Sequence, residues 1–245
     1  MLFDSHAHLN DARFDEDREA LIQKLQEEHV DLVLNPGADI ETSISSVELA
    51  NKYDFIYAAV GVHPHDVKDL DDTAIDTLRK LATENEKVVA IGEIGLDYYY
   101  DNSPREVQKE WFKKQIELAN ELKLPIIIHD RDAHQDTFEI IKNTKSPEIG
   151  CVLHCYSGNV ELAKEYVKMG YYIGVGGVVT FKNSRVLKEV VKAIPLECIV
   201  VETDCPYLAP APHRGKRNSS AYLPLVIEEI ARLKEITAEE VENVT

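Results

Sequence analysis

Residues 88–129 read VVAIGEIGLDYYYDNSPREVQKEWFKKQIELANELKLPIIIH. An apolar run at 88–93 is followed by a helical pattern at 104–122 and by a second apolar run at 125–129. Short runs rich in Val and Ile predict buried strands, and a longer amphipathic stretch predicts a helix. The segment therefore predicts two parallel strands joined by a helical crossover.

The same alternation extends along the whole chain. Predicted strands lie at 2–6, 31–35, 55–61, 88–93, 125–129, 151–154, 171–175 and 198–202. Helical stretches fill the gaps, for example at 15–28, 104–122 and 162–169. Eight repeats of about 30 residues predict an α/β fold of the (β/α)₈ TIM-barrel type. A doubly wound sheet alternates similarly, but here polar residues cluster after most strands, as they do at one face of a barrel.

Composition indicates a soluble globular protein. The chain has 245 residues, of which 44% are hydrophobic and 29% are charged, and this excludes a disordered or fibrous chain. No linker rich in Pro, Gly or Ser divides it, so we predict one domain over 1–245. The longest candidate membrane run, 171–181, falls short of the ~20 residues that a spanning helix needs. Four cysteines suggest no disulfide framework, and the N-terminus lacks a signal-peptide pattern. We expect a cytoplasmic protein without a membrane partner.

The charge balance restricts the kinds of partner. Lys and Arg total 27 against 44 Asp and Glu, which gives a formal net charge of −17. Such a charge argues against broad adhesion to nucleic acid or anionic membranes. A phosphate substrate would need a local positive field from metal ions or from a basic cluster.

The first strand ends in two histidines. His6 and His8 are spaced i and i+2, so their imidazoles project to the same side of a strand. Asp204 follows the eighth strand, which lies beside the first when a barrel closes. Glu202 has the same strand parity, and we favour Asp204 as the ligand because it lies further toward the mouth of the barrel.

Three further candidate ligands end apolar strands. Glu93 ends the fourth strand, where a buried carboxylate is costly without partners; a salt bridge across the barrel is the alternative. His129 and His154 each follow an apolar run. Asp97, four residues after Glu93, is expected in a loop, where it orients substrate.

Together these residues predict a two-metal site at the C-terminal face of the strands. Imidazoles and carboxylates suit divalent ions such as Mg²⁺, Mn²⁺ or Zn²⁺. Glu93 would bridge two ions, with one held by His6, His8 and Asp204 and the other by His129 and His154. Six candidate ligands result: His6, His8, Glu93, His129, His154 and Asp204.

Other residues are candidates for contact with the substrate. His63 ends the third strand and is expected to support the metal site or to bind a substrate phosphate, with a structural role as the alternative. The segment HRGKRN at 213–218 is a dense basic cluster, and its Arg214, Lys216 and Arg217 are expected to bind phosphate; a solvated loop is the alternative. The tyrosines at 98–100 would stack on bases or pack the loop.

These motifs resemble those of the TatD-family metal-dependent deoxyribonucleases. The matching segments are DSHAHLN near the start, GVHPH at 61–65, GEIGLDYY at 92–99, IHDRDA at 128–133, HCYSG at 154–158, ETDCPYLAP at 202–210 and RGKRN at 214–218. The resemblance implies a TIM barrel, a two-metal centre on the six residues above and hydrolysis of DNA phosphodiesters, often as a 3′→5′ exonuclease. This chain departs from the pattern at Ser219 and Ser220, where the family usually has an acidic residue and proline, and in its shorter C-terminal helix.

We therefore predict a metal-dependent hydrolase that acts on DNA ends, with no obligate protein partner. Glu93 and Asp204 are the predicted catalytic residues, Glu93 as the bridge and Asp204 as the general base. One alternative is a barrel amidohydrolase that cleaves an amide, ester or lactone of a small molecule. The other is a non-catalytic module that binds metal or nucleic acid.

Overall fold

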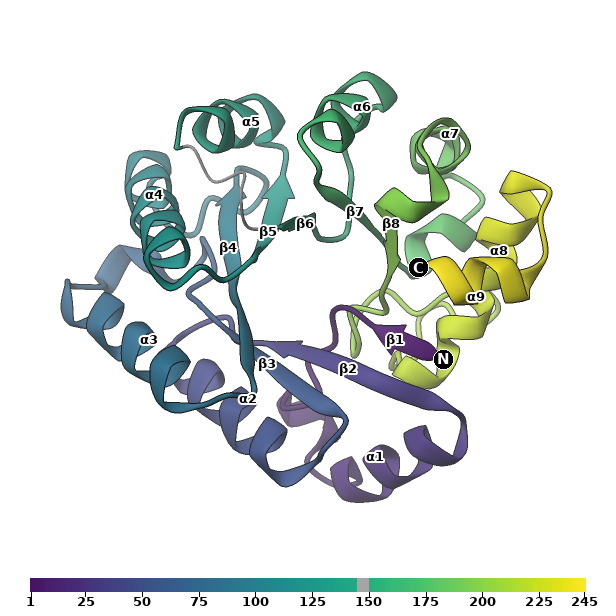
Figure 1. Ribbon diagram of the computed structural model, residues 1–245, viewed down its shortest axis with the longest axis horizontal. Helices are drawn as coiled ribbons and strands as arrows, with labels where there is room; N and C mark the ends of the chain where they lie inside the picture. The colour runs from purple at the N-terminus through teal and green to yellow at the C-terminus, as the bar shows by residue number, and fades with distance from the viewer. Residues whose placement is uncertain (145–149) are drawn as a thin grey trace. The chain divides into compact units, whose positions relative to one another are not determined.

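The computed structural model of the protein describes residues 1–144 and 150–245. These residues form two compact units. The first consists of Met1–Asn35 and Cys155–Thr245, and the second of Pro36–His154. Strands and helices alternate along both (Figure 1).

The first unit contains four parallel strands. They are β1 (Leu2–Asp4), β2 (Val30–Pro36), β7 (Tyr172–Val175) and β8 (Ile199–Val201). β1 pairs with β2, and β7 pairs with β8. β8 also runs beside β1, because the amide of Ser5 donates to the carbonyl of Val201 and Ala7 forms a parallel bridge with Cys205. The predicted proximity of the first and eighth strands is confirmed.

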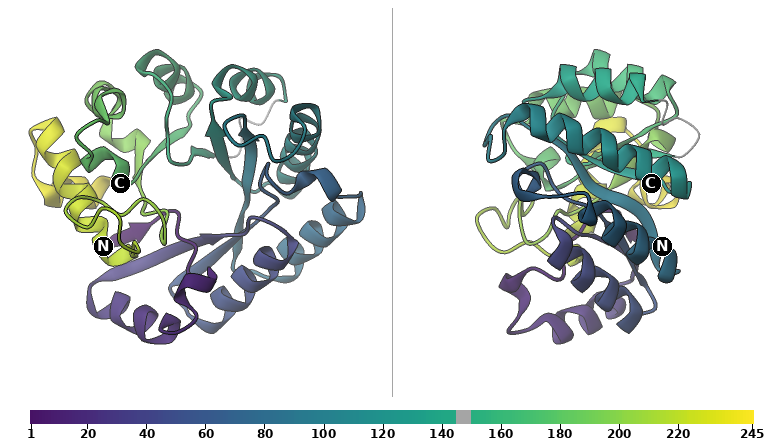
Figure 2. Two further views of the ribbon diagram at one scale, coloured as in Figure 1. Left: turned by 180° about the vertical axis from the view of Figure 1, so that it is seen from behind. Right: turned by 90° about the vertical axis from the view of Figure 1, so that its left-hand side faces the viewer.

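Helices cover one face of these strands (Figure 2). They are α1 (Arg18–Glu27), α6 (Val160–Lys168), α7 (Arg185–Ala193), α8 (Leu223–Lys234) and α9 (Ala238–Val244). Short 3₁₀ helices lie at Ala12–Phe14, Gly177–Thr180, Leu196–Cys198 and Ser220–Tyr222. In α7, Leu187, Val190 and Val191 are buried at helical spacing. Burial of each such side chain stabilises the fold by about 1.5–3 kcal/mol.

The second unit repeats this arrangement. Its parallel strands are β3 (Ile56–Val60), β4 (Val88–Asp97), β5 (Ile126–Arg131) and β6 (Cys151–Leu153), paired in that order. Its helices are α2 (Ile40–Lys52), α3 (Thr73–Glu84), α4 (Arg105–Leu122) and α5 (His134–Asn143), with a 3₁₀ helix at Val67–Asp69. A capping box starts α2, in which the Asp39 carboxylate accepts from the amide of Thr42 at 2.7 Å.

The alternation and the strand order identify the (β/α)₈ fold, so the predicted fold class is confirmed. One local expectation was wrong. β4 extends to Asp97, which is fully buried, and does not end at Glu93. The pairing of β4 with β5 shifts register between Ile91 and Ile94 and then resumes, with Asp97 opposite Arg131. A single domain over 1–245 stays a prediction.

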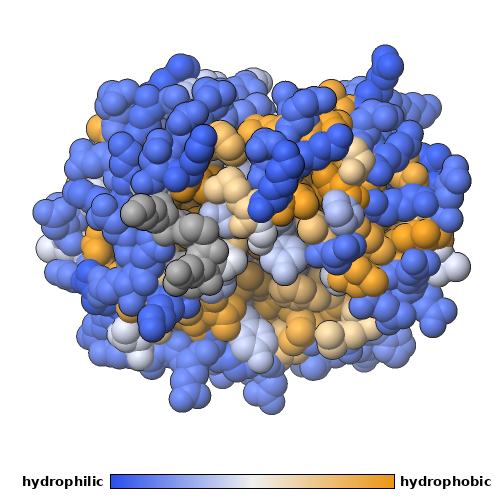
Figure 3. All heavy atoms as spheres, turned by 45° about the horizontal axis from the view of Figure 1, so that its top comes forward, coloured by the Kyte–Doolittle hydropathy of each residue, from blue (hydrophilic) through white to orange (hydrophobic). Residues whose placement is uncertain are grey.

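The surface and the thiols agree with the composition. Figure 3 shows mostly hydrophilic residues on the face it draws, with apolar residues between them. All four cysteines carry free thiols, as expected for a chain without a disulfide framework. Within the described part of the chain, no helix has the length and apolar character needed to cross a membrane.

Gly95 in β4 is the position least tolerant of a side chain. Its φ is +146°, and a Cβ there would collide with the carbonyl of His129 on β5. We expect Gly95→Ala to lower the free energy of unfolding by about 3–5 kcal/mol, because strain and steric displacement add. Gly170→Ala is the matched control, since its φ is +80° but no atom lies within 4 Å of the new Cβ. The control should lose about 1–2 kcal/mol. Urea denaturation measures both, and equal losses would contradict the steric argument.

Candidate metal centre

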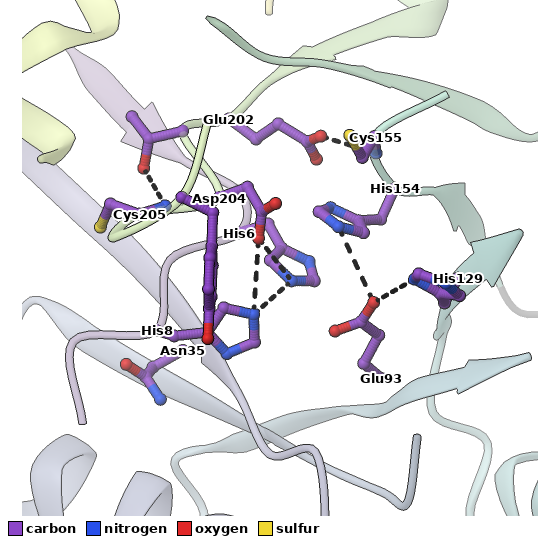
Figure 4. Close-up of polar contacts among 12 residues, drawn as sticks. His6, His8, Asn35, Glu93, His129, His154, Cys155, Glu202, Asp204 and Cys205 are labelled. Atoms are coloured by element: carbon purple, nitrogen blue, oxygen red, sulfur yellow. Dashed lines mark hydrogen bonds and ion pairs between the residues drawn. The ribbon is translucent and has the colours of Figure 1, made fainter. Parts of the chain in front are cut away.

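In the first unit, two imidazoles and a carboxylate converge beyond the ends of β1 and β8 (Figure 4). The Nε2 atoms of His6 and His8 are 3.2 Å apart. Oδ1 of Asp204 lies 3.6 Å from Nε2 of His8 and 4.0 Å from Nε2 of His6. Two nitrogens that bind the same ion, each at about 2.0–2.1 Å, must lie within ~4 Å of each other. This first-unit cluster therefore has the spacing of a divalent-ion site.

Backbone hydrogen bonds fix this cluster. The amide of Asp204 donates to the carbonyl of His6, and the amide of His8 donates to the carbonyl of Cys205, each at 2.8 Å. Asp204 itself has a φ of +56°, in the left-handed region. These candidate ligands are thus held by strand-like pairing between segments almost 200 residues apart in the sequence.

Asp4 is a buried carboxylate beneath the cluster that the sequence analysis missed. It accepts hydrogen bonds from the amide and the hydroxyl of Thr203 and from the amide of His6. Burial raises the pKa of Asp4 to about 6, against the lowering effect of hydrogen bonds from Ser220 and Thr203. The sequence feature that could have identified Asp4 is its position, directly after the apolar residues 1–3 and two residues before His6.

The structure separates the two carboxylates at the end of β8. Glu202 is fully buried, and its Oε1 accepts from the amide of Cys155 at 2.7 Å. Asp204 faces the two histidines instead. This placement agrees with the choice of Asp204 over Glu202 as the candidate ligand.

In the second unit, three imidazoles surround one carboxylate oxygen. Oε1 of Glu93, on β4, lies 2.9 Å from Nδ1 of His129 on β5 and 3.8 Å from Nε2 of His154, just beyond β6 (Figure 4). Nε2 of His63 lies 3.8 Å from the same oxygen. Ligand atoms of His63, Glu93 and His129 are close enough together to hold one ion. We call these four residues the Glu93 cluster.

Asp97 contacts the imidazoles of His129, in this cluster, and of His65. Its Oδ2 lies 2.9 Å from Nε2 of His129 and 3.0 Å from Nε2 of His65. Both ring nitrogens of His129 face a carboxylate oxygen, so without a metal each carries a proton, and Asp97 keeps the proton of Nε2 in place. Carboxylate partners of this kind commonly fix the tautomer of a metal-binding histidine. Nδ1 is therefore the atom of His129 that is available to a metal.

The pKa values follow from these contacts. Burial acts to raise the pKa of Asp97, but hydrogen bonds from His129 and His65 outweigh it and hold that pKa well below its usual range. Burial acts to lower the pKa of His129, but Asp97 and Glu93 raise it to about 9. Burial and the nearby charge of His129 lower the pKa of His63, so His63 is neutral. A metal that binds Nδ1 of His129 displaces a proton.

The basic segment lies in the first unit, and its side chains have different surroundings. Arg217 forms a bidentate pair with Asp17, at 2.5 and 2.8 Å, and donates to the carbonyl of Arg13. The guanidinium of Arg214 lies 4.1 Å from the ring centre of Phe181. Lys216 is exposed. Phosphate binding by this segment stays a prediction, and Arg217 would have to leave Asp17 to take part.

The sequence model of the family described as "TatD related DNase" matches residues 3–245. The chain belongs to the TatD family. It is 48% identical to "Uncharacterized metal-dependent hydrolase YabD" of Bacillus subtilis, over 100% of this chain and 96% of that protein. It is 38% identical to a similarly named Escherichia coli K12 protein, YcfH, over 100% and 92%. The solved structure of YjjV, a TatD homolog from Escherichia coli K12, matches this chain with a TM-score of 0.93 and 30% sequence identity. The match covers 99% of this chain and 94% of the YjjV chain. This TatD-family chain is a metal-dependent hydrolase, as the sequence analysis predicted.

Asp97 supplies a direct test of the geometry around His129. We expect Asp97→Asn to weaken binding of Zn²⁺ or Mn²⁺ by about 10–100-fold. The amide has one acceptor oxygen in place of two, so its NH₂ group must face either His129 and His65 or the amides of Tyr99 and Tyr100. Isothermal titration calorimetry on metal-stripped protein measures the affinity.

Asp101→Asn serves as the control, because that carboxylate pairs with Arg105 at the surface. Thermal melting of both variants without metal checks that the fold is retained. An unchanged metal affinity in Asp97→Asn would show that His129 does not bind metal through Nδ1.

Proposed function

We propose that the two clusters supply ligands to one two-metal centre, which hydrolyses phosphodiester bonds at DNA ends in the 3′→5′ direction. In this proposal Glu93 would contribute to both ions, His6, His8 and Asp204 would hold one, and His129 and His154 would hold the other. The observation that carries it is the position of Glu93, whose Oε1 lies within 3.8 Å of three imidazole nitrogens. Four of the six side chains follow the C-terminal ends of strands, and Glu93 and His129 lie in the C-terminal halves of β4 and β5. Active sites of the (β/α)₈ fold lie at this end of the strands.

The chemistry suits phosphate esters. Bound divalent ions lower the pKa of a coordinated water toward ~7 and neutralise charge on phosphoryl oxygens. Asp204 is partly exposed beside His6 and His8, so its carboxylate is placed to accept a proton from the attacking water. His63 is neutral and close to Glu93, and it would donate to a phosphate oxygen.

The charge of the protein also supports this substrate class. In a chain of net charge −17, a polyanion is attracted only by local positive charge. Two ions carry +4 against −2 from Glu93 and Asp204. Lys216, exposed in the basic segment, would add a contact to a flanking phosphate.

Replacement of Glu93 tests the proposal. We expect Glu93→Ala to reduce release of mononucleotides from a 3′-labelled single-stranded oligomer below about one-hundredth of the parent rate, because the ions contribute several kcal/mol to the transition state. The assay compares chelated protein with protein given Mg²⁺, Mn²⁺ or Zn²⁺. Glu86→Ala, an exposed carboxylate before β4, is the control and should retain activity.

Three outcomes would contradict the proposal. Full activity of Glu93→Ala would exclude the bridging role. Cleavage of a small ester or lactone without nucleotide release would assign the protein to the amidohydrolases. Binding of DNA without turnover under any ion would make it a binding module.

Lys216 allows a separate test of the basic segment. We expect Lys216→Ala to reduce the slope of log affinity against log salt concentration by about 0.7 for single-stranded DNA, since one phosphate contact is lost. Lys113→Ala, an exposed lysine on α4, should leave the slope unchanged. Fluorescence anisotropy titrations over a range of KCl concentrations measure both. The same slope in parent and Lys216→Ala would exclude a phosphate contact at this residue.

A further inference from the structure

Two exposed tyrosines and an arginine lie together at the ends of β4 and β5. Tyr99 and Tyr100 lie two and three residues after the end of β4, and Arg131 is the last residue of β5. The tyrosines are 59% and 54% exposed, which is unusual for adjacent aromatic side chains. We call these residues the Tyr99–Tyr100–Arg131 platform. Neither the metal centre nor the basic segment includes them.

The three side chains of the platform pack against one another. The two tyrosine rings are perpendicular, with centres 4.9 Å apart. The guanidinium of Arg131 lies 4.1 Å from the ring centre of Tyr99 and 4.8 Å from that of Tyr100. Planar groups in this arrangement present π surfaces to a further planar group.

Tyr98 does not belong to the platform. Its hydroxyl donates to Asp136, and the guanidinium of Arg105 lies 4.1 Å from its ring centre. It is therefore held against α4 and α5. Of the three tyrosines that the sequence offered for base stacking, the structure leaves Tyr99 and Tyr100 largely exposed.

The platform is held in place by the same carboxylate that contacts His129. Oδ1 of Asp97 accepts from the amides of Tyr99 and Tyr100, at 3.0 and 2.8 Å. This fixes the backbone that carries both rings. A preorganised surface loses less conformational entropy when a ligand binds.

A series of ring contacts leads from the platform to the Glu93 cluster. The Tyr100 ring lies 5.3 Å from that of His65, His65 lies 4.2 Å from His63, and His63 lies 4.3 Å from His129, between ring centres. All of these residues belong to the second unit. A continuous row of packed side chains therefore connects a planar group on the platform to the Glu93 cluster.

We propose that the Tyr99–Tyr100–Arg131 platform binds the base of an unpaired nucleotide next to the phosphate that is cleaved. The inference rests on the proposed function and adds a base-binding subsite to it. Aromatic stacking is the usual means by which proteins hold single strands without sequence preference, and it contributes about 1–3 kcal/mol per base. In a duplex the bases are already stacked on one another, so the platform favours single-stranded or frayed ends.

The surroundings of Arg131 favour a base over a phosphate. Asp130 and Asp132 flank it in the sequence. These carboxylates offset the positive field that a phosphate would require. The flat face of the guanidinium still stacks on a base.

Binding is tested with two short single-stranded oligomers, one complete and one lacking its 3′-terminal bases. Each is titrated against protein that carries Glu93→Ala, which prevents turnover. We expect Tyr99→Ala with Tyr100→Ala to weaken binding of the complete oligomer by roughly 5- to 150-fold. Binding of the abasic oligomer should not change. Arg131→Lys keeps the charge but loses the planar group, so it should give a smaller loss for the complete oligomer.

Tyr172→Ala is the matched control, because Tyr172 is an exposed tyrosine at the start of β7. It should leave binding of both oligomers unchanged. Equal losses for the complete and the abasic oligomer would overturn the subsite, and so would unchanged binding of the complete oligomer.

The activity of the parent enzyme separates the two proposals. If the parent releases nucleotides and the double tyrosine variant does so with the same kcat/KM on single strands, the subsite is wrong and the nuclease proposal stands. If the parent hydrolyses a small phosphodiester but no DNA, the substrate class fails and the subsite fails with it. A fall in kcat/KM for single strands that is absent for the abasic oligomer supports both.

Discussion

Burial of carboxylates on strands or directly after them is the constraint on which both clusters depend. Asp4, Glu93, Asp97 and Glu202 are all buried, and an unpaired charge in that position would cost several kcal/mol. Each of these carboxylates therefore lies close to N–H groups that can donate hydrogen bonds to it. Asp4 and Glu202 bind backbone amides, Glu93 faces imidazoles, and Asp97 binds both kinds of group. Asp4 holds the backbone of His6, and Asp97 holds the imidazole of His129.

Much of this arrangement could be predicted from the sequence, because the signals are local. Runs of Val and Ile predicted the strands, and a polar residue that ends such a run stands out. The pairing of His6 and His8 with Asp204 followed from the closure of the strand order, since the first and eighth strands are neighbours in this fold.

Two features could not be predicted, for different physical reasons. The predicted fourth strand ended at Glu93, but Gly95 lets β4 pass close to His129 and continue to Asp97. A single sequence does not reveal such an irregular register. The pair between Arg217 and Asp17 joins positions 200 residues apart, and nothing in either local segment specifies the other.

The second unit is one continuous stretch of chain, whereas the first unit combines two separate stretches, and they therefore become complete at different times during synthesis. The second unit is one continuous segment, so Glu93, His129 and His154 can come together once residue 154 has left the ribosome. The first unit joins the two ends of the chain, and His6 and His8 must wait for Asp204. During translation the candidate ligands of the second unit are therefore all synthesised about 50 residues before Asp204 completes those of the first unit.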